Sequence, residues 1–210
     1  MLHFNESTTT QLAELEKEIA ALQEKRRALL SEACGSEVAH YDFIRSDGTP
    51  ATLAEMFGER DELIVIHNMG RRCSYCTLWA DGFNGVAAHL ADRAAFALVS
   101  PDPPDVQSAF AASRGWSFPL YSSAANTFTD DMGYQEATAD GGTSTWPGVS
   151  VFTKDAAGTI RRVACDVFGP GDSYAGIWHL FELLPGGPGE WFPRLAYKET
   201  VSEEAGLERE

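Results

Sequence analysis

The chain has 210 residues, which fits one domain with a single core, and its 44% hydrophobic content is that of a globular protein. It lacks the run of about 18 to 20 apolar residues that a membrane-spanning helix requires, and its net charge of −15 opposes binding to phosphate backbones. We therefore expect a soluble protein that binds neither membrane nor nucleic acid. We also expect a cytoplasmic location, because the first residues lack a basic segment followed by an apolar stretch.

Residues 8–33 are predicted to form one long amphipathic helix, which opens with a capping box at Thr8 to Gln11 and ends near Gly35. Two alternatives stay open for residues 1–35: the helix lies on its own domain, or it pairs with a second copy in a homodimer. Its apolar residues recur at spacings of three and four, with Arg26 on the same stripe: Leu12, Leu15, Ile19, Leu22 and Leu29.

Residues 36–185 alternate between strand and helix patterns. An almost wholly apolar, β-branched run, Leu63 to His67, is typical of a central strand buried on both faces. The other predicted strands are 38–43, 95–99, 149–152 and 160–168, and the helices are a short one capped by Thr52 and Glu55, 76–93, 106–114 and 172–184. The first part predicts parallel strands and the last two strands an antiparallel hairpin, so we expect an α/β fold with a central mixed sheet flanked by helices.

Residues 186–210 are predicted to be a tail. The segment Pro185 to Gly189 is rich in proline and glycine and cannot sustain regular structure. From Glu199 onward the chain is acidic and poor in apolar residues, so we expect the final dozen residues to be disordered.

Cys73 and Cys76 form a Cys-x-x-Cys pair at the start of a predicted helix, directly after the buried strand. Free amide groups and the helix dipole favour a thiolate at that position, so Cys73 is the expected nucleophile. Arg71 and Arg72 add positive potential and should lower the pKa of the Cys73 thiol further, although water and salt screen exposed guanidinium groups. Cys76, one turn later, is the expected resolving thiol.

A Cys-x-x-Cys pair can also be one half of a zinc site. The sequence has no second Cys-x-x-Cys and no His-x-x-His to complete such a site, so we expect neither a metal nor another cofactor. Cys34 and Cys165 are expected to be structural thiols, one at a helix end and one in a strand, because four cysteines in this length do not resemble a disulfide scaffold.

Trp146 and Pro147 stand just before the hairpin, where a proline that opens a strand can be cis and face the dithiol; a trans turn with Gly148 is the alternative. His67 ends the central strand six residues before Cys73 and is a candidate proton acceptor for Cys76, although a buried structural histidine fits equally.

Three side chains flank the two cysteines: Arg72, Tyr75 and Trp79. Together with Trp146 and Pro147 they are the candidate substrate-binding residues. For Trp79, which lies four residues before Phe83 on the helix, packing against the sheet is the main expectation and lining of a substrate groove the other.

The run from Cys73 to Gly85, with Leu63 to His67, Gly115 to Ser123 and Pro147 to Phe152, resembles a bacterial family known as domain of unknown function eight-nine-nine. The resemblance covers roughly residues 10 to 185. It implies a thioredoxin-like fold related to peroxiredoxins and alkyl hydroperoxide reductases, preceded by a helix. The chain departs from the usual family motif in having Ser74 where a proline is common.

Three functions follow as hypotheses. The leading one is a thiol-disulfide oxidoreductase acting on a disulfide-containing protein or a small thiol. The second is a thiol peroxidase, although Ile66 and Gly70 stand where the peroxiredoxin motif Pro-x-x-x-Thr-x-x-Cys has proline and threonine before Cys73. The third is a non-enzymatic dimeric interaction module or redox sensor.

Overall fold

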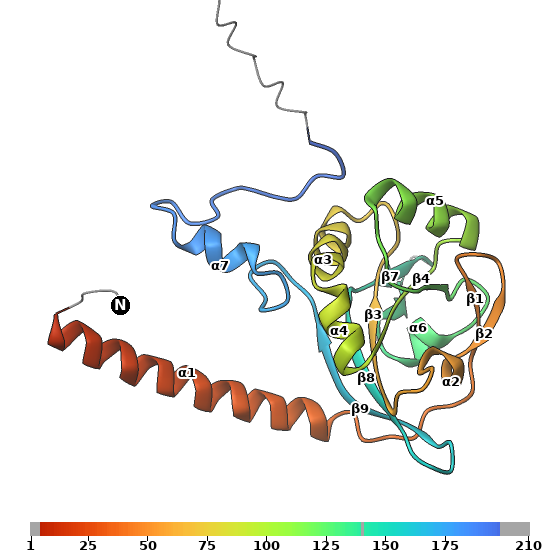
Figure 1. Cartoon of the computed structure of the whole chain (residues 1–210). Coiled ribbons are helices and arrows are strands. Elements are labelled where there is room, and N and C mark those ends of the chain that lie inside the picture. Colours follow the sequence, from red (N-terminus) through yellow and green to blue (C-terminus); the bar gives the residue numbers. More distant parts are fainter. Residues whose placement is uncertain (1–4, 140, 198–210) are drawn as a thin grey trace, which may run out of the picture.

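The computed structural model describes residues 5–139 and 141–197 and contains a seven-stranded mixed sheet with helices on both sides (Figure 1). Strand β3 pairs in parallel with β4 and β4 with β5, whereas the other pairs of the sheet are antiparallel. In sheet order the strands are β2 (Pro50–Thr52), β1 (Asp42–Arg45), β5 (Leu120–Ser122), β4 (Ala95–Ser100), β3 (Glu62–His67), β8 (Gly148–Lys154) and β9 (Ile160–Val167). The predicted α/β fold with a mixed central sheet is confirmed.

Strand β3 is the centre of the core, as its apolar sequence predicts. Because side chains alternate along a strand, Leu63 and Val65 enter one hydrophobic cluster while Ile66 enters the other, on the opposite face of the sheet. The first cluster includes Phe128 and the second includes Trp79. Both faces of the sheet are therefore covered.

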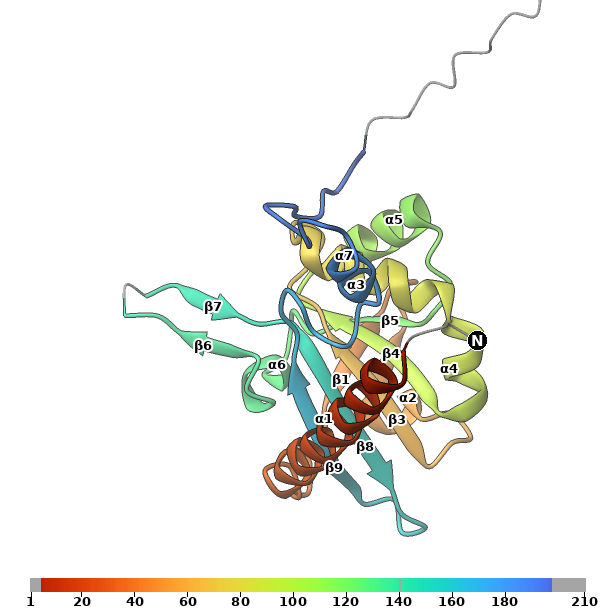
Figure 2. The ribbon, with the colours of Figure 1, turned by 90° about the vertical axis from the view of Figure 1, so that its left-hand side faces the viewer.

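The helices that cover the sheet differ in part from the predicted ones. The predicted helix 76–93 is two helices, α3 (Ser74–Gly85) and α4 (Ala87–Arg93), which meet at Val86, where φ is −121° and ψ is 12°. The remaining ones are α2 (Leu53–Met56), with the expected Thr52–Glu55 capping box, α5 (Pro104–Arg114), α6 (Phe128–Asp131) and α7 (Ile177–Glu182). Strands β6 (Gln135–Ala137) and β7 (Thr143–Thr145) form a separate ribbon that projects from the domain (Figure 2).

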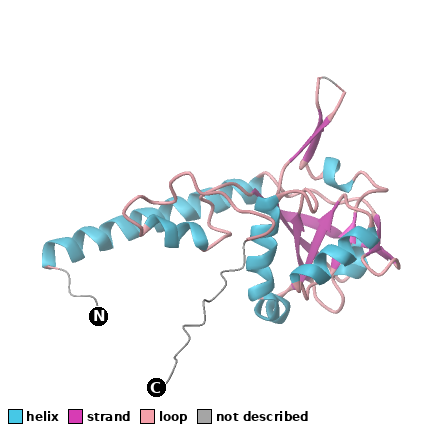
Figure 3. Cartoon of the chain, turned by 90° about the horizontal axis from the view of Figure 1, so that it is seen from above, coloured by secondary structure: helices cyan, strands magenta, loops and turns pink. Residues whose placement is uncertain are grey.

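Helix α1 (Glu6–Glu32) extends away from the sheet as a long rod (Figures 1 and 3). Its N-cap is Asn5, whose side chain accepts the backbone N–H of Thr8, so the helix starts earlier than the predicted capping box at Thr8. No residue of α1 is buried. The carboxyl-terminal part of the helix packs against β9, and this contact holds it on the domain.

Cys34 and Cys165 form a disulfide between the end of α1 and strand β9. This corrects the expectation of two structural thiols. The two residues are 131 positions apart in sequence, and only the fold brings them together.

After α7 the described chain continues to residue 197 without a further helix or strand, as its proline and glycine content predicts. The predicted disorder of the final dozen residues concerns positions outside the described part of the chain. Within residues 5–139 and 141–197, no helix combines the length and the apolar character needed to cross a membrane.

Candidate functional site

The dithiol lies where the sequence places it, at the amino end of α3. Cys73 is the N-cap residue, with extended backbone angles, and Cys76 lies in the first turn. Both are free thiols; Cys73 is partly exposed and Cys76 is buried. The Sγ atom of Cys73 accepts the backbone N–H of Cys76 at 3.1 Å, so the two residues are held within one helical turn of each other.

Backbone N–H groups of the loop between β3 and Cys73 donate hydrogen bonds to two polar side chains that the sequence patterns do not single out. The amide oxygen of Asn68 accepts the N–H of Gly70 at 2.7 Å, and the carboxylate of Asp102 accepts the N–H of Arg71 at 2.6 Å. Gly70 adopts a φ of +101°, and an added Cβ would lie 3.0 Å from the Asp102 carboxylate, so this position favours glycine. The Asp-Pro-Pro sequence after β4 gives no sign of this contact.

The two thiols are electrostatically different. The hydrogen bond from the Cys76 side chain is the largest influence on Cys73 and, with the N–H groups of Cys76 and Tyr75, it lowers the pKa of Cys73 to about 7 against the opposing effect of burial. The same side-chain hydrogen bond, burial and the negative charge on Cys73 raise the pKa of Cys76, although the N–H of Met69 donates to its sulfur. A thiolate therefore forms first on Cys73.

Arg71 and Arg72 are both exposed. The lowered pKa of Cys73 is caused by Cys76 and by backbone N–H groups rather than by either guanidinium. This differs from the expected contribution of the two arginines and agrees with the strong screening of exposed charges by water.

His67 is buried in the sheet. Its Nε2 atom lies 2.8 Å from Oγ of Ser150, and its ring stacks on Tyr134 with 3.8 Å between ring centroids and on Phe128. Burial and, to a lesser degree, the charge of Arg162 hold the pKa of His67 well below 6.5. The ring is thus packed as a neutral core group, and its predicted role as a proton acceptor for Cys76 stays a prediction.

Pro147 directly precedes Gly148, which is paired with His67 across the β3–β8 ladder. Because these strands are antiparallel, Pro147 lies beside the start of the loop that leads to Cys73. The expectation that this proline can be cis is not met, since all peptide bonds of the described residues are trans. The exposed Trp146 donates its backbone N–H to the carbonyl oxygen of Tyr134, and the carbonyl oxygen of Pro147 accepts the backbone N–H of Phe168. This segment is therefore fixed by backbone hydrogen bonds.

Tyr75 and Trp79 have different surroundings. Trp79 is 2% exposed and donates its indole N–H to Asp172, so its environment is that of a packing residue rather than of a groove wall. Tyr75 is half-buried, stacks on Trp178, and lines a pocket of about 460 Å³ with Trp191 and the segment that follows α7. Of the two, Tyr75 alone lies next to open space in which a partner could dock.

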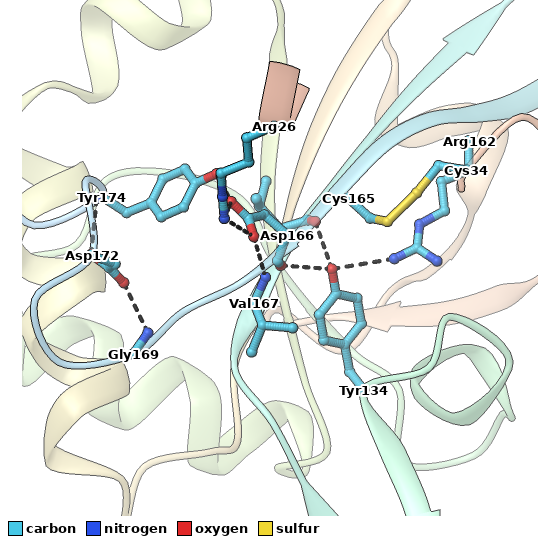
Figure 4. Close-up of polar contacts among 11 residues, drawn as sticks. Arg26, Cys34, Tyr134, Arg162, Cys165, Asp166, Val167, Gly169, Asp172 and Tyr174 are labelled. Atoms are coloured by element: carbon cyan, nitrogen blue, oxygen red, sulfur yellow. Dashed lines mark hydrogen bonds and ion pairs between the residues drawn. A yellow bond between two sulfur atoms is a disulfide. The ribbon is translucent and has the colours of Figure 1, made fainter. Parts of the chain in front are cut away.

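A second polar cluster lies at the carboxyl end of β9 (Figure 4). The buried carboxylate of Asp166 accepts hydrogen bonds from Arg26 of α1 at 2.6 Å and from the hydroxyl of Tyr174, also at 2.6 Å. Tyr134 donates its hydroxyl to the carbonyl of Asp166. This cluster ties α1 and the segment before α7 to the edge of the sheet.

Metal ligands do not gather among residues 5–139 and 141–197, where no group of three or more His, Cys, Asp or Glu could hold an ion. The other two cysteines, Cys34 and Cys165, are bonded to each other and so are not available as metal ligands.

The fold is that of several solved peroxiredoxins. Peroxidoxin BcpB from Mycobacterium tuberculosis is 24% identical with a TM-score of 0.53, and the match covers 68% of this chain and 89% of that one. A cysteine-to-serine variant of PrxQ from Xylella fastidiosa is 16% identical with a TM-score of 0.58, covering 69% and 91%. A variant of Xanthomonas campestris peroxiredoxin Q is 19% identical with a TM-score of 0.51, covering 65% and 84%. At these identities the likeness shows the fold alone.

No curated protein matches the sequence. The sequence profile of the family described as "Bacterial protein of unknown function (DUF899)" matches residues 4–202. Because this match spans nearly the whole chain and the fold is the thioredoxin-like fold of peroxiredoxins, the protein belongs to the DUF899 family.

Proposed function

We propose that this protein is a thiol-disulfide oxidoreductase that uses Cys73 and Cys76. The observation that carries the proposal is the asymmetry of the two thiols: Cys73, partly exposed at a helix amino end, has its pKa lowered to about 7, while burial and Cys73 itself raise the pKa of Cys76. A large share of Cys73 is then a thiolate at neutral pH, and Cys76 is kept protonated until it is needed.

In the first step the Cys73 thiolate attacks one sulfur of a substrate disulfide, forms a mixed disulfide and releases the other substrate sulfur as a thiolate. In the second step Cys76 gives up its proton and attacks Sγ of Cys73, which releases the remaining substrate thiol and leaves a Cys73–Cys76 disulfide. The substrate gains two electrons and the protein loses two, so an external thiol must reduce the protein again. His67 as proton acceptor, and Trp146 and Pro147 as contacts for the substrate backbone, belong to this proposal.

Thiol peroxidase activity is the second candidate, and the specific observation in its favour is that solved proteins with this fold carry peroxiredoxin names. Here the Cys73 thiolate would attack a peroxide, take one oxygen as a sulfenic acid and release an alcohol or water, and Cys76 would then form the disulfide with loss of water. The residues at the motif positions, Ile66 and Gly70, do not favour rapid peroxide reduction.

A single-turnover experiment separates the two candidates. The protein with Cys73 and Cys76 reduced and the Cys34–Cys165 disulfide intact is mixed with the neutral small disulfide hydroxyethyl disulfide or with hydrogen peroxide, and the thiols consumed are counted by mass spectrometry. An oxidoreductase forms the Cys73–Cys76 disulfide with the disulfide substrate, C76S stops at a mixed disulfide on Cys73, and the matched variant C73S does not react. Fast oxidation by peroxide alone would support the peroxidase instead, and an inert pair with both reagents would refute both enzymes.

A further inference from the structure

Helix α1 carries an apolar stripe that residues 5–139 and 141–197 leave exposed. The five large apolar residues of the stripe are between 40% and 66% exposed, and none of the 27 residues of α1 is buried. Isolated exposed leucines are common on protein surfaces, but a continuous stripe at heptad spacing is typical of a helix that packs against another helix. The stripe consists of Leu12, Leu15, Ile19, Leu22 and Leu29.

An open apolar cavity of about 700 Å³ adjoins the carboxyl-terminal half of the same helix. Its floor includes Ile64 and Val151 of the sheet, and Phe83 and Leu90 of α3 and α4 form part of its wall. Helix α1 supplies another part of the wall through Gln23, Arg26, Arg27 and Leu30, so Arg26 belongs to both the wall and the stripe. The stripe and the cavity therefore adjoin each other and form one apolar surface.

We propose that a second copy of this chain covers this surface, with the two α1 helices antiparallel and Leu12 and Leu15 of each copy lying over the cavity of the other. In heptad terms Leu12, Ile19 and Arg26 take the a positions and Leu15, Leu22 and Leu29 the d positions. In an antiparallel pair centred between Ile19 and Leu22, these two residues meet across the axis. Residues 11–18 of one copy then lie opposite residues 23–30 of the other, which is the stretch that walls the cavity.

Charge complementarity favours the antiparallel over the parallel arrangement. Glu18 and Lys25 both take g positions, and g positions of antiparallel helices flank each other, so the dimer gains two Glu18–Lys25 pairs. A parallel pair would instead place Glu18 beside Gln23 and Lys25 beside Leu30. In its own helix neither Glu18 nor Lys25 has an opposite charge three or four positions away.

Arg26 does not oppose this packing, because its charge is already neutralised within the chain. Its guanidinium binds the Asp166 carboxylate, which Tyr174 also binds (Figure 4). In the dimer the aliphatic part of Arg26 covers Leu15 of the second copy while the guanidinium keeps its partner. The arginine on the stripe is thus compatible with a helix pair.

The position of the domain also suits the antiparallel dimer. At about 1.5 Å per residue, α1 is roughly 40 Å long, and the domain packs on its carboxyl-terminal part alone (Figures 1 and 2). An antiparallel pair puts the two domains at opposite ends of the helix pair and makes a closed, two-fold symmetric dimer. A parallel pair would bring both domains to the same end, where they would compete for space beside the helices.

Sedimentation equilibrium of the full chain tests the proposal. We expect a dimer, and we expect I19E, at an exposed position of α1, to be monomeric with unchanged circular dichroism and unchanged Cys73 reactivity. E18K or K25E should each weaken the dimer about tenfold, since each converts two attractive pairs into two repulsive ones. The double variant E18K/K25E should restore the dimer, whereas E14K, with the same charge change on the outer face, should leave it unchanged.

A monomeric wild-type chain would overturn the proposal, as would a dimer that I19E leaves intact. Failure of the double variant to restore association would exclude the antiparallel register. A monomer that retains a small apolar molecule in native mass spectrometry would show that the cavity binds a ligand instead of a second copy. None of these outcomes depends on the redox activity of Cys73 and Cys76.

Discussion

Replacement of Cys76 by alanine removes the side-chain hydrogen bond that is the largest cause of the low pKa of Cys73. The backbone N–H groups of residues 75 and 76 still favour the thiolate and burial still opposes it, so their effects partly cancel. We therefore expect the pKa of Cys73 to rise from about 7 toward its ordinary value of 9.0. C76S keeps a hydroxyl donor at the same place and should leave the pKa of Cys73 much closer to 7.

The effect on reactivity can be worked out from these values. At pH 7 the thiolate fraction of Cys73 would fall from about one half to about one hundredth, roughly 50-fold. The more basic thiolate is a better nucleophile by about six- to tenfold, for a Brønsted coefficient of about 0.4 to 0.5. The rate at pH 7 should then fall only about five- to eightfold, and above pH 9 C76A should react faster than the wild-type protein.

The assay is the rate of Cys73 alkylation by iodoacetamide between pH 5 and 10, followed by mass spectrometry so that modification of Cys73 is counted separately. Wild-type and C76A profiles that cross near pH 8 would support this reasoning. A C76A profile that still has its midpoint near 7 would refute it and would assign the low pKa of Cys73 to the helix end alone.

Three further predictions concern the core and the second cysteine pair. G148A should destabilise the fold by about 1 to 3 kcal/mol in urea unfolding, because the new Cβ would collide with the Tyr134 ring and a backbone carbonyl of β9; unchanged stability would show that β8 can shift. The pKa of His67 is lowered in the folded state, so the contribution of His67 to stability is complete above about pH 6.5 and is lost as the pH falls below that value. The urea midpoint of unfolding should therefore decrease from pH 7 to pH 5, and H67Q should make that decrease smaller. An equal decrease in H67Q would show that His67 does not cause it. Thiol titration of the unfolded, unreduced protein should find the thiols of Cys73 and Cys76 but not those of Cys34 and Cys165, and four reactive thiols would contradict the disulfide.

The strands with strong sequence patterns are the ones that could be predicted. The apolar run of β3 and the β8–β9 hairpin with its turn were predicted because burial on both faces and turn residues leave a clear local signal. Strand β5, with three residues, and the β6–β7 ribbon were missed, since such short segments take their conformation from neighbouring strands rather than from their own sequence.

The helix boundaries were predicted less well than the strands. Helix α1 begins after Asn5 rather than at Thr8, because an asparagine side chain can cap a helix as well as a threonine and several polar residues compete there. Gly82 and Gly85 lower the stability of the predicted helix, but they do not show that it breaks at Val86.

The dithiol was located correctly because a Cys-x-x-Cys after a buried strand is a local pattern. Its electrostatics were predicted in part: backbone N–H groups at the helix end lower the pKa of Cys73 as expected, but the largest cause is the Cys76 side chain rather than Arg71 or Arg72. The bond between Cys34 and Cys165 could not be predicted, because the register of β9 and the end of α1 bring the two together and neither is encoded in cysteine spacing.

The most direct test of the central claim is equilibration of the reduced protein with glutathione redox buffers, with the oxidised form mapped by mass spectrometry. The proposed function predicts one reversible two-electron transition in which Cys73 and Cys76 form a disulfide with each other, and its midpoint will show whether the protein acts as a reductant or an oxidant. A glutathione adduct that accumulates on Cys73 without attack by Cys76, or a pair that stays reduced in every buffer, would contradict a thiol-disulfide oxidoreductase.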